Sequence, residues 1–247
     1  MRSDPYALLA EVATAIDADN WILVGGLMVH CHAERSGIMH TRPTDDADIV
    51  VELQTQSYAT HAQALISLGF APHESLDDAA PFHRFVRDQD TVDLMIPDRE
   101  SRAPRYLGRG LIEVPGSSSA LKRTIAHELP DGSAIRIPDL ASALSLKGAA
   151  HRVPSANAPR HLQDSVTLLA CAGPGGLDPA PSKSMRVNLN HVVKCLSTTA
   201  EAWSLASPQN RVLATQCIRA LRPDWAVPSF LGSTRTTTTR RRRRPSQ

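Results

Sequence analysis

Residues 21–53 decide the fold, and their sequence is WILVGGLMVHCHAERSGIMHTRPTDDADIVVEL. The apolar run 21–24 ends at the glycine pair 25–26, which is typical of a buried strand that ends in a tight turn. Residues 46–53 predict a second strand, because their apolar residues form a short continuous run. Residues 27–35 lie between the two runs and predict a helix. The segment therefore predicts two strands that are connected through a helix and a long loop.

The rest of the chain supplies more elements of both kinds. Helices are predicted over 5–18, 56–68, 139–152 and 159–172, a helical region over 189–221, and strands over 83–87, 91–96, 126–129 and 134–137. Short polar links between the strands of each later pair are typical of hairpins. This mixture predicts an α+β or α/β core with a helical C-terminal part.

Composition excludes several classes of protein. The hydrophobic fraction of 42% in 247 residues is sufficient for a buried core and too high for a disordered chain. The net charge is +2, but five arginines at 240–244 supply it, so the rest of the chain carries −3. No global basic field therefore points to nucleic acid. The arginine tail itself could bind RNA or DNA phosphates or be incidental.

Cysteine use and apolar run lengths suit a cytoplasmic protein. The four cysteines form no C-x-x-C pair, so reduced thiols are expected. No run of about 18 apolar residues exists, and we expect no membrane partner. His30, Cys31, His32 and His40 could suggest zinc, but residues two apart on a helix do not share a face. Ordinary core or surface roles are the better interpretation for them.

The strand at 46–53 begins with two aspartates at alternate positions. Asp46 and Asp48 point to the same face because successive side chains of a strand alternate. Two carboxylates on one face repel each other, so something must compensate their charge. Mg²⁺ takes oxygen ligands and leaves positions for phosphate oxygens. A solvated strand end is the alternative interpretation of such a pair.

A third carboxylate, Asp93, stands in the apolar run Thr91–Ile96. A lone acid on a core strand costs free energy unless it is paired, hydrogen-bonded or bound to a metal. If this strand neighbours the strand of Asp46 and Asp48, the three carboxylates converge, which is the minimum for a two-metal phosphoryl-transfer site. The alternative is a salt bridge from Asp93 to Arg84 or Arg87.

Together these motifs resemble a known superfamily. Gly25-Gly26, Arg42-x-Thr44-x-Asp46-x-Asp48 and Val92-Asp93-Leu94 are similar to the motifs of DNA polymerase β-like nucleotidyltransferases. Within them the chain most resembles the AbiEii toxins of type IV toxin–antitoxin and abortive-infection systems. Ile137–Leu140 with Leu146–Ala149 resembles that group's lysine-bearing helix, and Arg160-x-x-x-Asp164 resembles its following element. The resemblance covers about residues 20–172.

The resemblance implies a role for each matching residue. It implies that Gly25 and Gly26 let the backbone approach a triphosphate, with Arg42 and Thr44 beside the phosphates. Asp46, Asp48 and Asp93 would hold Mg²⁺, and Asp93 would also help to activate the attacking hydroxyl. Lys147 would neutralise phosphate charge, and Asp164 would orient that lysine or the base. The implied fold is a mixed sheet flanked by helices.

The implied reaction moves a nucleoside monophosphate from an NTP to a hydroxyl acceptor. The resemblance implies the 3′ end of a tRNA or a protein side chain as acceptor, and a separate antitoxin protein as partner. An aminoglycoside-type, small-molecule nucleotidyltransferase and a catalytically inactive binding module on the same fold are the alternatives. The chain departs from the family pattern at Gly26, often serine, at Gln163, usually basic, and in a longer loop over 34–41.

These expectations divide the chain along its length. Residues 1–137 form the nucleotidyltransferase core, and residues 138–172 form a helical part that completes the site. A Gly- and Pro-rich linker covers 173–183. A C-terminal helical region covers 184–232, and the basic tail 233–247 is expected to be disordered.

Overall fold

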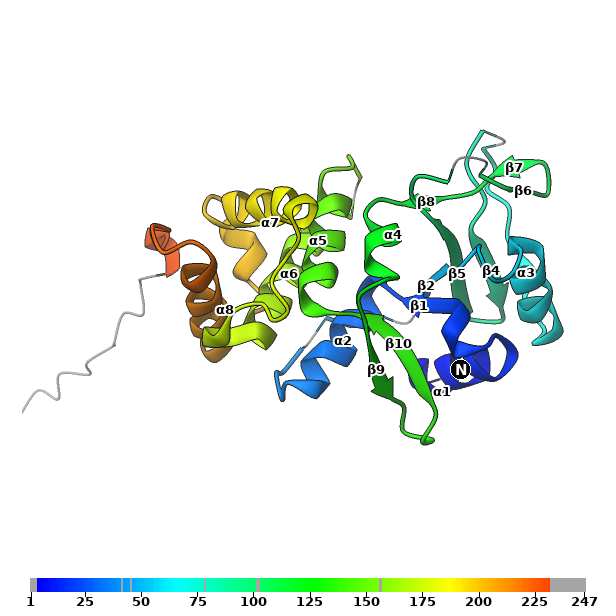
Figure 1. Cartoon of the computed structure of the whole chain (residues 1–247), viewed down its shortest axis with the longest axis horizontal. Coiled ribbons are helices and arrows are strands. Elements are labelled where there is room, and N and C mark those ends of the chain that lie inside the picture. The colour runs from blue at the N-terminus through cyan, green and yellow to red at the C-terminus, as the bar shows by residue number, and fades with distance from the viewer. Residues whose placement is uncertain are drawn as a thin grey trace, which may run out of the picture.

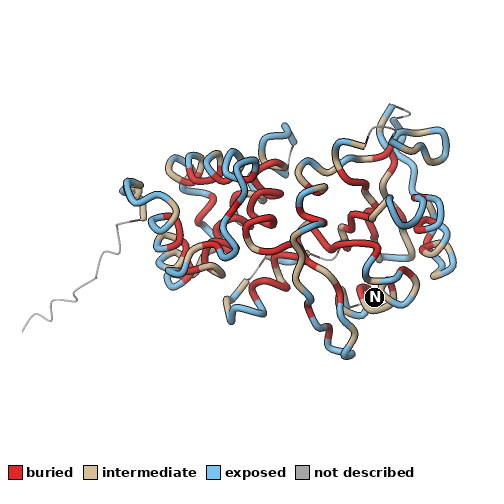
Figure 2. The backbone as a smooth tube through the Cα atoms, viewed as in Figure 1, coloured by how far each residue is buried: buried red, intermediate tan, exposed pale blue. Residues whose placement is uncertain are grey.

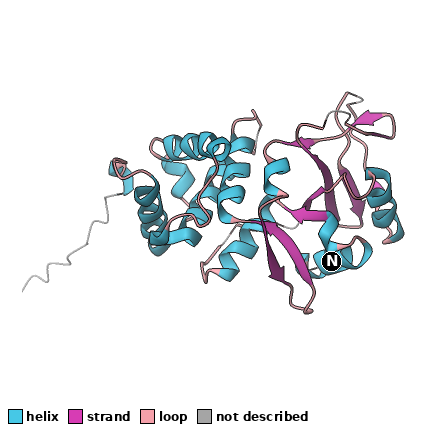
Figure 3. Ribbon diagram, viewed as in Figure 1, coloured by secondary structure: helices cyan, strands magenta, loops and turns pink. Residues whose placement is uncertain are grey.

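The computed structural model describes residues 4–40, 42–44, 46–77, 79–100, 103–155 and 157–231. The expectation for the tail at 233–247 lies outside the described residues. Figure 1 shows an elongated molecule with a sheet in one half and a group of helices in the other. Figure 3 shows the same division, with a separate two-stranded ribbon projecting between the halves.

The main sheet is mixed. Its strand order is β1-β2-β5-β4-β3, and β8 pairs with the end of β5. Strands β2 and β5 are parallel, as are β5 and β8, and the other neighbours are antiparallel. The strands are β1 (Trp21–Leu23), β2 (Ala47–Val51), β3 (Ala71–Pro72), β4 (Arg84–Arg87), β5 (Asp90–Pro97) and β8 (Glu113–Val114).

The two faces of this sheet carry different side chains of β2. Ala47, Ile49 and Val51 of β2 belong to the main hydrophobic core, on the face covered by α1 (Pro5–Ala15), α2 (Gly25–Arg35) and α3 (Tyr58–Ser67). Alternation turns Asp48 and Val50 to the opposite face. Figure 2 shows that buried residues follow the strands and the inner sides of the helices.

The helices begin where the sequence supplies capping side chains. The Asp4 carboxylate accepts a hydrogen bond from the Tyr6 amide at the start of α1, and Ser57 accepts one from Thr60 at the start of α3. Helix α5 starts after Asp139, whose carboxylate accepts from the Ser142 amide. The expected glycine turn at 25–26 is wrong in one respect, because both glycines form the first turn of α2.

The second half is helical. Helices α5 (Leu140–His151) and α6 (Ala158–Ala172) pack closely against each other, α7 (Lys183–Leu196) packs on α5, and α8 (Pro208–Leu221) packs on α6. None of the described helices is long and apolar enough to cross a membrane. The other elements of the described chain are η1 (Ala18–Asn20), β6 (Arg105–Tyr106), β7 (Arg109–Gly110), α4 (Ser117–Ala120), β9 (Thr124–Glu128), β10 (Ala134–Pro138), η2 (Gly173–Gly175), η3 (Ala200–Trp203) and η4 (Ser229–Leu231).

The α+β class, the mixed sheet flanked by helices and the helical C-terminal region are confirmed. The expected long loop after residue 34 starts later, because α2 continues to Arg35. Two polar contacts hold the loop against the helical half. His40 Nδ1 lies 3.2 Å from Thr167 Oγ1, and Asn210 Nδ2 donates a hydrogen bond to the Met39 carbonyl at 2.9 Å. This loop therefore links the sheet to α6 and α8.

Candidate functional site

Three carboxylates lie in or just before the neighbouring strands β2 and β5. Strands β2 and β5 are parallel neighbours, and Asp48 is the register partner of Asp93. Asp46 comes just before β2 and is exposed. The condition under which the carboxylates would come together, that the two strands are neighbours, is therefore met. We refer to Asp46, Asp48 and Asp93 as the acidic wall.

The glycine pair at the start of α2 makes room for the acidic wall. A Cβ atom added to Gly25, which has φ +66°, would collide with the Asp48 carboxylate. A Cβ added to Gly26 would lie 2.5 Å from Thr44 Oγ1 and 2.7 Å from Arg42 Nη2. The Gly26 amide also donates a hydrogen bond to Asp48. Because neither glycine has a side chain, the Asp48 carboxylate can approach the N-terminus of α2, where the helix dipole favours negative charge.

Asp48 carries charge that its surroundings do not compensate. Burial, the neighbouring charge of Asp93 and, more weakly, that of Asp46 raise its pKa to about 7, although Lys147 and the Gly26 amide oppose the shift. A carboxyl group in this state gains from any cation that enters the pocket. The acidic wall therefore favours cation binding.

Asp93 has a partner already. Arg84 of β4 is directly opposite Asp93 in the antiparallel register and donates two hydrogen bonds to its carboxylate, both 2.8 Å long. The salt-bridge interpretation of Asp93 is therefore correct for Arg84. Arg87 instead binds Glu11 and Asp90. Because Arg84 is more than a third exposed, it can share the carboxylate with a bound cation.

A second wall faces the pocket from the helical half. Lys147 of α5 places Nζ 2.7 Å from Asp164 Oδ2 of α6. Arg42 donates two hydrogen bonds to the same carboxylate, from Nε at 2.9 Å and from Nη2 at 3.1 Å. Asp164 is almost completely buried. We refer to Arg42, Lys147 and Asp164 as the cationic wall, because its three charges sum to +1.

Burial and pairing compete at Asp164, and pairing wins. Burial alone would raise the pKa of Asp164, but the charges and hydrogen bonds of Lys147 and Arg42 lower it below the usual range. Lys147 is itself only 5% exposed. Its ammonium therefore does not reach bulk water along its stem and lies against the Asp164 carboxylate instead.

Residues of both walls line one pocket of about 220 Å³. Every residue that the sequence nominated for the site lines it, although the residues come from segments far apart in the chain. Four further residues line it as well. The lining consists of Gly25, Gly26, Arg42, Thr44, Asp46, Asp48, Arg84, Asp93, Lys147, Asn157, Arg160, His161 and Asp164.

His161 was not nominated from the sequence. It precedes Asp164 by three residues on α6, so the two share a face, and that spacing was the available signal. Burial first, and then the Lys147 charge, lower its pKa to about 4, so the imidazole is neutral near pH 7. In the described part of the chain, the buried Nδ1 has no hydrogen-bond partner. The hydrogen-bonding capacity of this buried nitrogen is therefore unsatisfied.

An apolar pocket of about 320 Å³ adjoins the charged one. The two share Gly25, Asp48, Lys147 and His161. The remaining lining is mostly aliphatic and comes from the sheet, the β8 region and α5: Val24, Met28, Met95, Ile112, Glu113, Val114, Pro115, Leu146, Ala150, Val153 and Ser155. A ligand with a charged part and a flat apolar part would fit the combined space.

The residues present fit a hard divalent cation. The donor set consists of carboxylate oxygens, which Mg²⁺ prefers, and the Asp48 carboxylate occupies a cradle that a side chain at position 25 would fill. The four residues considered for zinc are used differently. His30 Nε2 lies 2.7 Å from the Arg42 carbonyl, and His32 Nε2 lies 2.9 Å from the Pro138 carbonyl.

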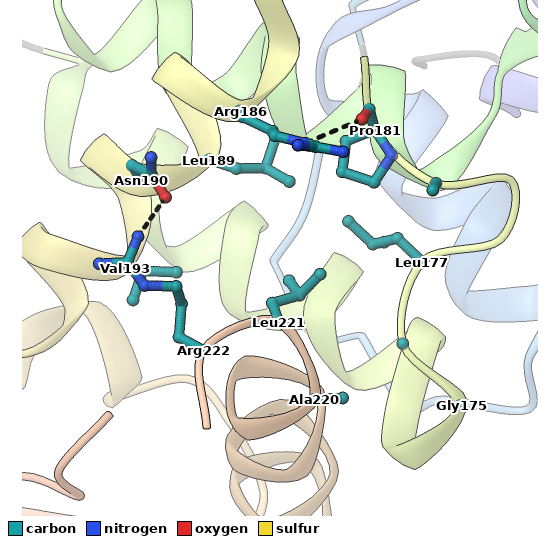
Figure 4. Close-up of a pocket in the computed structure, with 12 residues that line it drawn as sticks. Gly175, Leu177, Pro181, Arg186, Leu189, Asn190, Val193, Ala220, Leu221 and Arg222 are labelled. Carbon is teal, nitrogen blue, oxygen red and sulfur yellow. Dashed lines mark hydrogen bonds between the residues drawn. The ribbon is translucent and has the colours of Figure 1, made fainter. Parts of the chain in front are cut away.

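A larger pocket of about 470 Å³ lies away from both walls, among η2, α7 and the end of α8 (Figure 4). Arg222 lines it and donates to Asn190 Oδ1 at 2.7 Å, and Arg186 donates from Nε to the Pro181 carbonyl. Its described lining includes no carboxylate. It therefore does not provide a place for a hard cation.

Comparison with known proteins gives structural likeness only. No family model matches the chain, and no curated protein matches it. A crystal structure of an antigenic nucleotidyltransferase-like protein from Paracoccidioides brasiliensis aligns over 83% of this chain and 95% of that chain, with 15% identity and a TM-score of 0.48. The solution structure of antibiotic-resistance factor ANT(2'')-Ia aligns over 90% and 96%, with 16% identity and a TM-score of 0.39.

Proposed function

We propose that the protein is a Mg²⁺-dependent nucleotidyltransferase, which transfers a nucleoside monophosphate from an NTP to a hydroxyl acceptor and releases pyrophosphate. One observation carries the proposal: a carboxylate wall and a cationic wall line the same pocket. Phosphoryl transfer needs this combination, because it depends on positioning and on neutralising phosphate charge.

The cationic wall would bind the triphosphate. Arg42 and Lys147 are held by Asp164, so both cations keep their positions before a ligand arrives. Thr44 and Arg160 line the same pocket and offer a hydroxyl and a further guanidinium. Charge-assisted hydrogen bonds to phosphate are stronger than neutral ones. This side of the pocket would therefore determine NTP affinity.

The acidic wall would hold the metal. Bound Mg²⁺ supplies positive charge to the phosphate oxygens and to the leaving pyrophosphate. Asp46 and Asp48 are the first ligands on this view, since Asp93 is shared with Arg84. Asp93 is positioned to accept the proton of the acceptor hydroxyl once the Arg84 contact loosens.

The apolar pocket is suited to the nucleobase. Its lining is aliphatic, with Val24, Met95 and Leu146 among its walls, and a flat base can pack against such side chains. His161 lies at the junction of the two pockets and presents a neutral imidazole that can accept or donate one hydrogen bond. An NTP could thus lie across the junction.

The proposed acceptor is taken from the AbiEii resemblance. That resemblance favours the 3′ end of a tRNA or a protein side chain, and a toxin held in check by a cognate antitoxin. The same resemblance supports the proposed division of the chain, because Lys147 and Asp164 come from the helical part 138–172, whereas the carboxylates of the acidic wall come from the core 1–137.

A transfer assay tests the function and the acceptor together. The purified chain is incubated with each α-labelled NTP and Mg²⁺, in parallel with total tRNA, with cell protein and with an aminoglycoside. Label on tRNA or protein supports the toxin proposal, and label on the aminoglycoside supports the small-molecule alternative. Nucleotide binding without transfer to any acceptor, including water, would indicate an inactive binding module.

A further inference from the structure

Two histidines and a cysteine meet between α5 and α7, outside both pockets of the proposed active site. His151 is the last residue of α5, and His191 and Cys195 are one turn apart on α7. His151 Nδ1 lies 2.8 Å from His191 Nε2, and that nitrogen lies 3.7 Å from Cys195 Sγ. Among the described residues, this is the one group of three potential metal-ligand atoms that all lie within 4.8 Å of one another.

The spacing of these atoms is close to that of a metal site. Tetrahedral zinc has Zn–N bonds of about 2.0–2.1 Å and Zn–S bonds of about 2.3 Å. Those bonds place two ligand nitrogens about 3.3 Å apart and a nitrogen and a sulfur about 3.6 Å apart. The observed nitrogen–sulfur distance of 3.7 Å fits already. The two imidazoles would need to separate by about 0.5 Å, which small rotations of half-buried side chains allow.

The protonation states also suit a metal. Burial lowers the pKa of His151, and burial together with the charges of Arg152 and Lys194 lowers that of His191. Both rings are therefore neutral near pH 7, which is the form that binds metal. Burial raises the pKa of the Cys195 thiol, although Lys194 opposes the shift. A metal ion must displace the thiol proton, and the resulting thiolate offsets the two nearby cations.

We propose that His151, His191 and Cys195 form a binding site for a zinc-class transition-metal ion that joins α5 to α7. Two imidazoles and a thiolate are soft and borderline ligands, which select zinc or cobalt over Mg²⁺. The three protein ligands leave the fourth position to water or to an exogenous group. Binding releases one proton, from Cys195 Sγ. The site shares no residue with the acidic wall, so the two metals do not compete for ligands.

The position of the site gives it a structural consequence. Lys147 precedes His151 by four residues on α5, so the two lie one turn apart on the same helix. An ion at His151 would fasten the end of this helix to α7. We therefore expect Zn²⁺ to raise the melting temperature of the protein, since a ligand that binds only the folded state stabilises it.

Cobalt spectroscopy tests the proposal on the full chain. The protein is reduced with a phosphine and titrated with Co²⁺ in excess Mg²⁺, so that carboxylate sites are already filled. We expect one ion to bind per chain, with a thiolate-to-cobalt charge-transfer band and the visible bands of tetrahedral Co²⁺, and Zn²⁺ to displace it. The absence of a charge-transfer band in the full chain would overturn the proposal.

Two variants and two matched controls locate the ion. Cys195→Ser should abolish the charge-transfer band, and His191→Gln should weaken Co²⁺ binding at least about a hundredfold, since even outer-shell changes cost ten- to a hundredfold. Cys171→Ser and the exposed His73→Gln should bind as the parent does. Circular dichroism without metal checks that each variant folds. A band that survives in Cys195→Ser, or that disappears in the controls as well, would show that the ion binds elsewhere or only adventitiously.

Discussion

The acidic wall and the cationic wall face the same pocket but differ in how their charges are balanced. In the cationic wall, Asp164 contacts both Lys147 and Arg42, and its pKa is held below the usual range despite burial. In the acidic wall, Asp48 has no such contact with a cation among the described residues, and its pKa is raised to about 7. The fold therefore pairs the Asp164 carboxylate with two cations, whereas among the described residues it brings no cation into contact with the Asp48 carboxylate.

The difference indicates which side of the pocket is complete before a ligand binds. Salt bridges preorganise the cationic wall, and preorganised charges cost no rearrangement when a substrate arrives. The acidic wall carries repulsion that a bound cation relieves.

The largest effect is expected from Asp48→Asn. Loss of this ligand should lower the transfer rate at least about a thousandfold, because metal-dependent charge stabilisation supplies several kcal/mol. The same change should raise the melting temperature of the metal-free protein at pH 8, since it removes a repelling charge. Glu52→Gln, at the opposite end of β2, is the matched control and should change neither quantity. Normal transfer by Asp48→Asn would mean that the acidic wall is not the metal site.

The next effect concerns stability and comes from the opposite wall. Asp164→Asn leaves Lys147 and Arg42 without their shared anion, and breaking a buried ion pair costs about 3–5 kcal/mol. Urea unfolding should show that loss, while the exposed pair partner Asp224, changed to Asn, should show almost none. Adding Lys147→Met to Asp164→Asn should restore part of the stability. A loss below about 1 kcal/mol would mean that Asp164 does not support the cationic wall.

Lys147→Met tests whether the buried lysine acts on the substrate as well as on Asp164. Arg42 still pairs with Asp164 in this variant, so the fold should survive. The transfer rate should fall about ten- to a hundredfold, because a charge-assisted contact worth roughly 1.5–3 kcal/mol is lost. Arg123→Met, which removes the cation paired with Asp139 at the N-cap of α5, is the control for losing a positive charge that contacts this helix. Full activity in Lys147→Met would restrict the lysine to a structural role.

The acidic wall was predictable from the sequence because it depends on local periodicity. Alternation along residues 46–48 places two carboxylates on one face, and the apolar run around Asp93 marks a core strand that can pair with it. The sequence left the pairing of the two strands open, although the continuous apolar character of both is compatible with the parallel register that the structure shows.

The cationic wall depends on contacts that no local pattern encodes. Arg42 meets Asp164 across 122 residues of sequence, through the loop after α2 and the packing of α6. The resemblance nominated both residues but did not indicate that they pair. The roles of Arg84 and His161 and the steric need for Gly25 beside Asp48 likewise depend on the register and packing of the folded chain.

The smallest effect is a pH dependence that separates the walls by titration. Under the proposed function Mg²⁺ would bind the ionised form of Asp48, and the pKa of about 7 in the folded protein means that affinity for Mg²⁺ should rise as pH rises through 7. Between pH 8 and pH 6 the affinity should fall about tenfold, because the ionised fraction falls by that factor.

The stability of the metal-free protein should change in the opposite direction. Between the ordinary aspartate pKa of about 3.9 and pH 7 the folded chain binds more protons at Asp48 than the unfolded chain does, so stability falls as pH rises through this window. The pKa of Asp164 is lowered, so Asp164 contributes stability that is lost only at more acidic pH.

Calorimetry with Mg²⁺ at pH 6, 7 and 8 measures the change in Mg²⁺ affinity, and urea unfolding measures the change in stability of the metal-free protein. His83 lies 3.9 Å from Asp93 Oδ2, so His83→Gln controls for a histidine contribution. An affinity for Mg²⁺ that is constant across this range, in the parent and in His83→Gln, would show that Asp48 is already compensated and that the contrast between the walls is wrong.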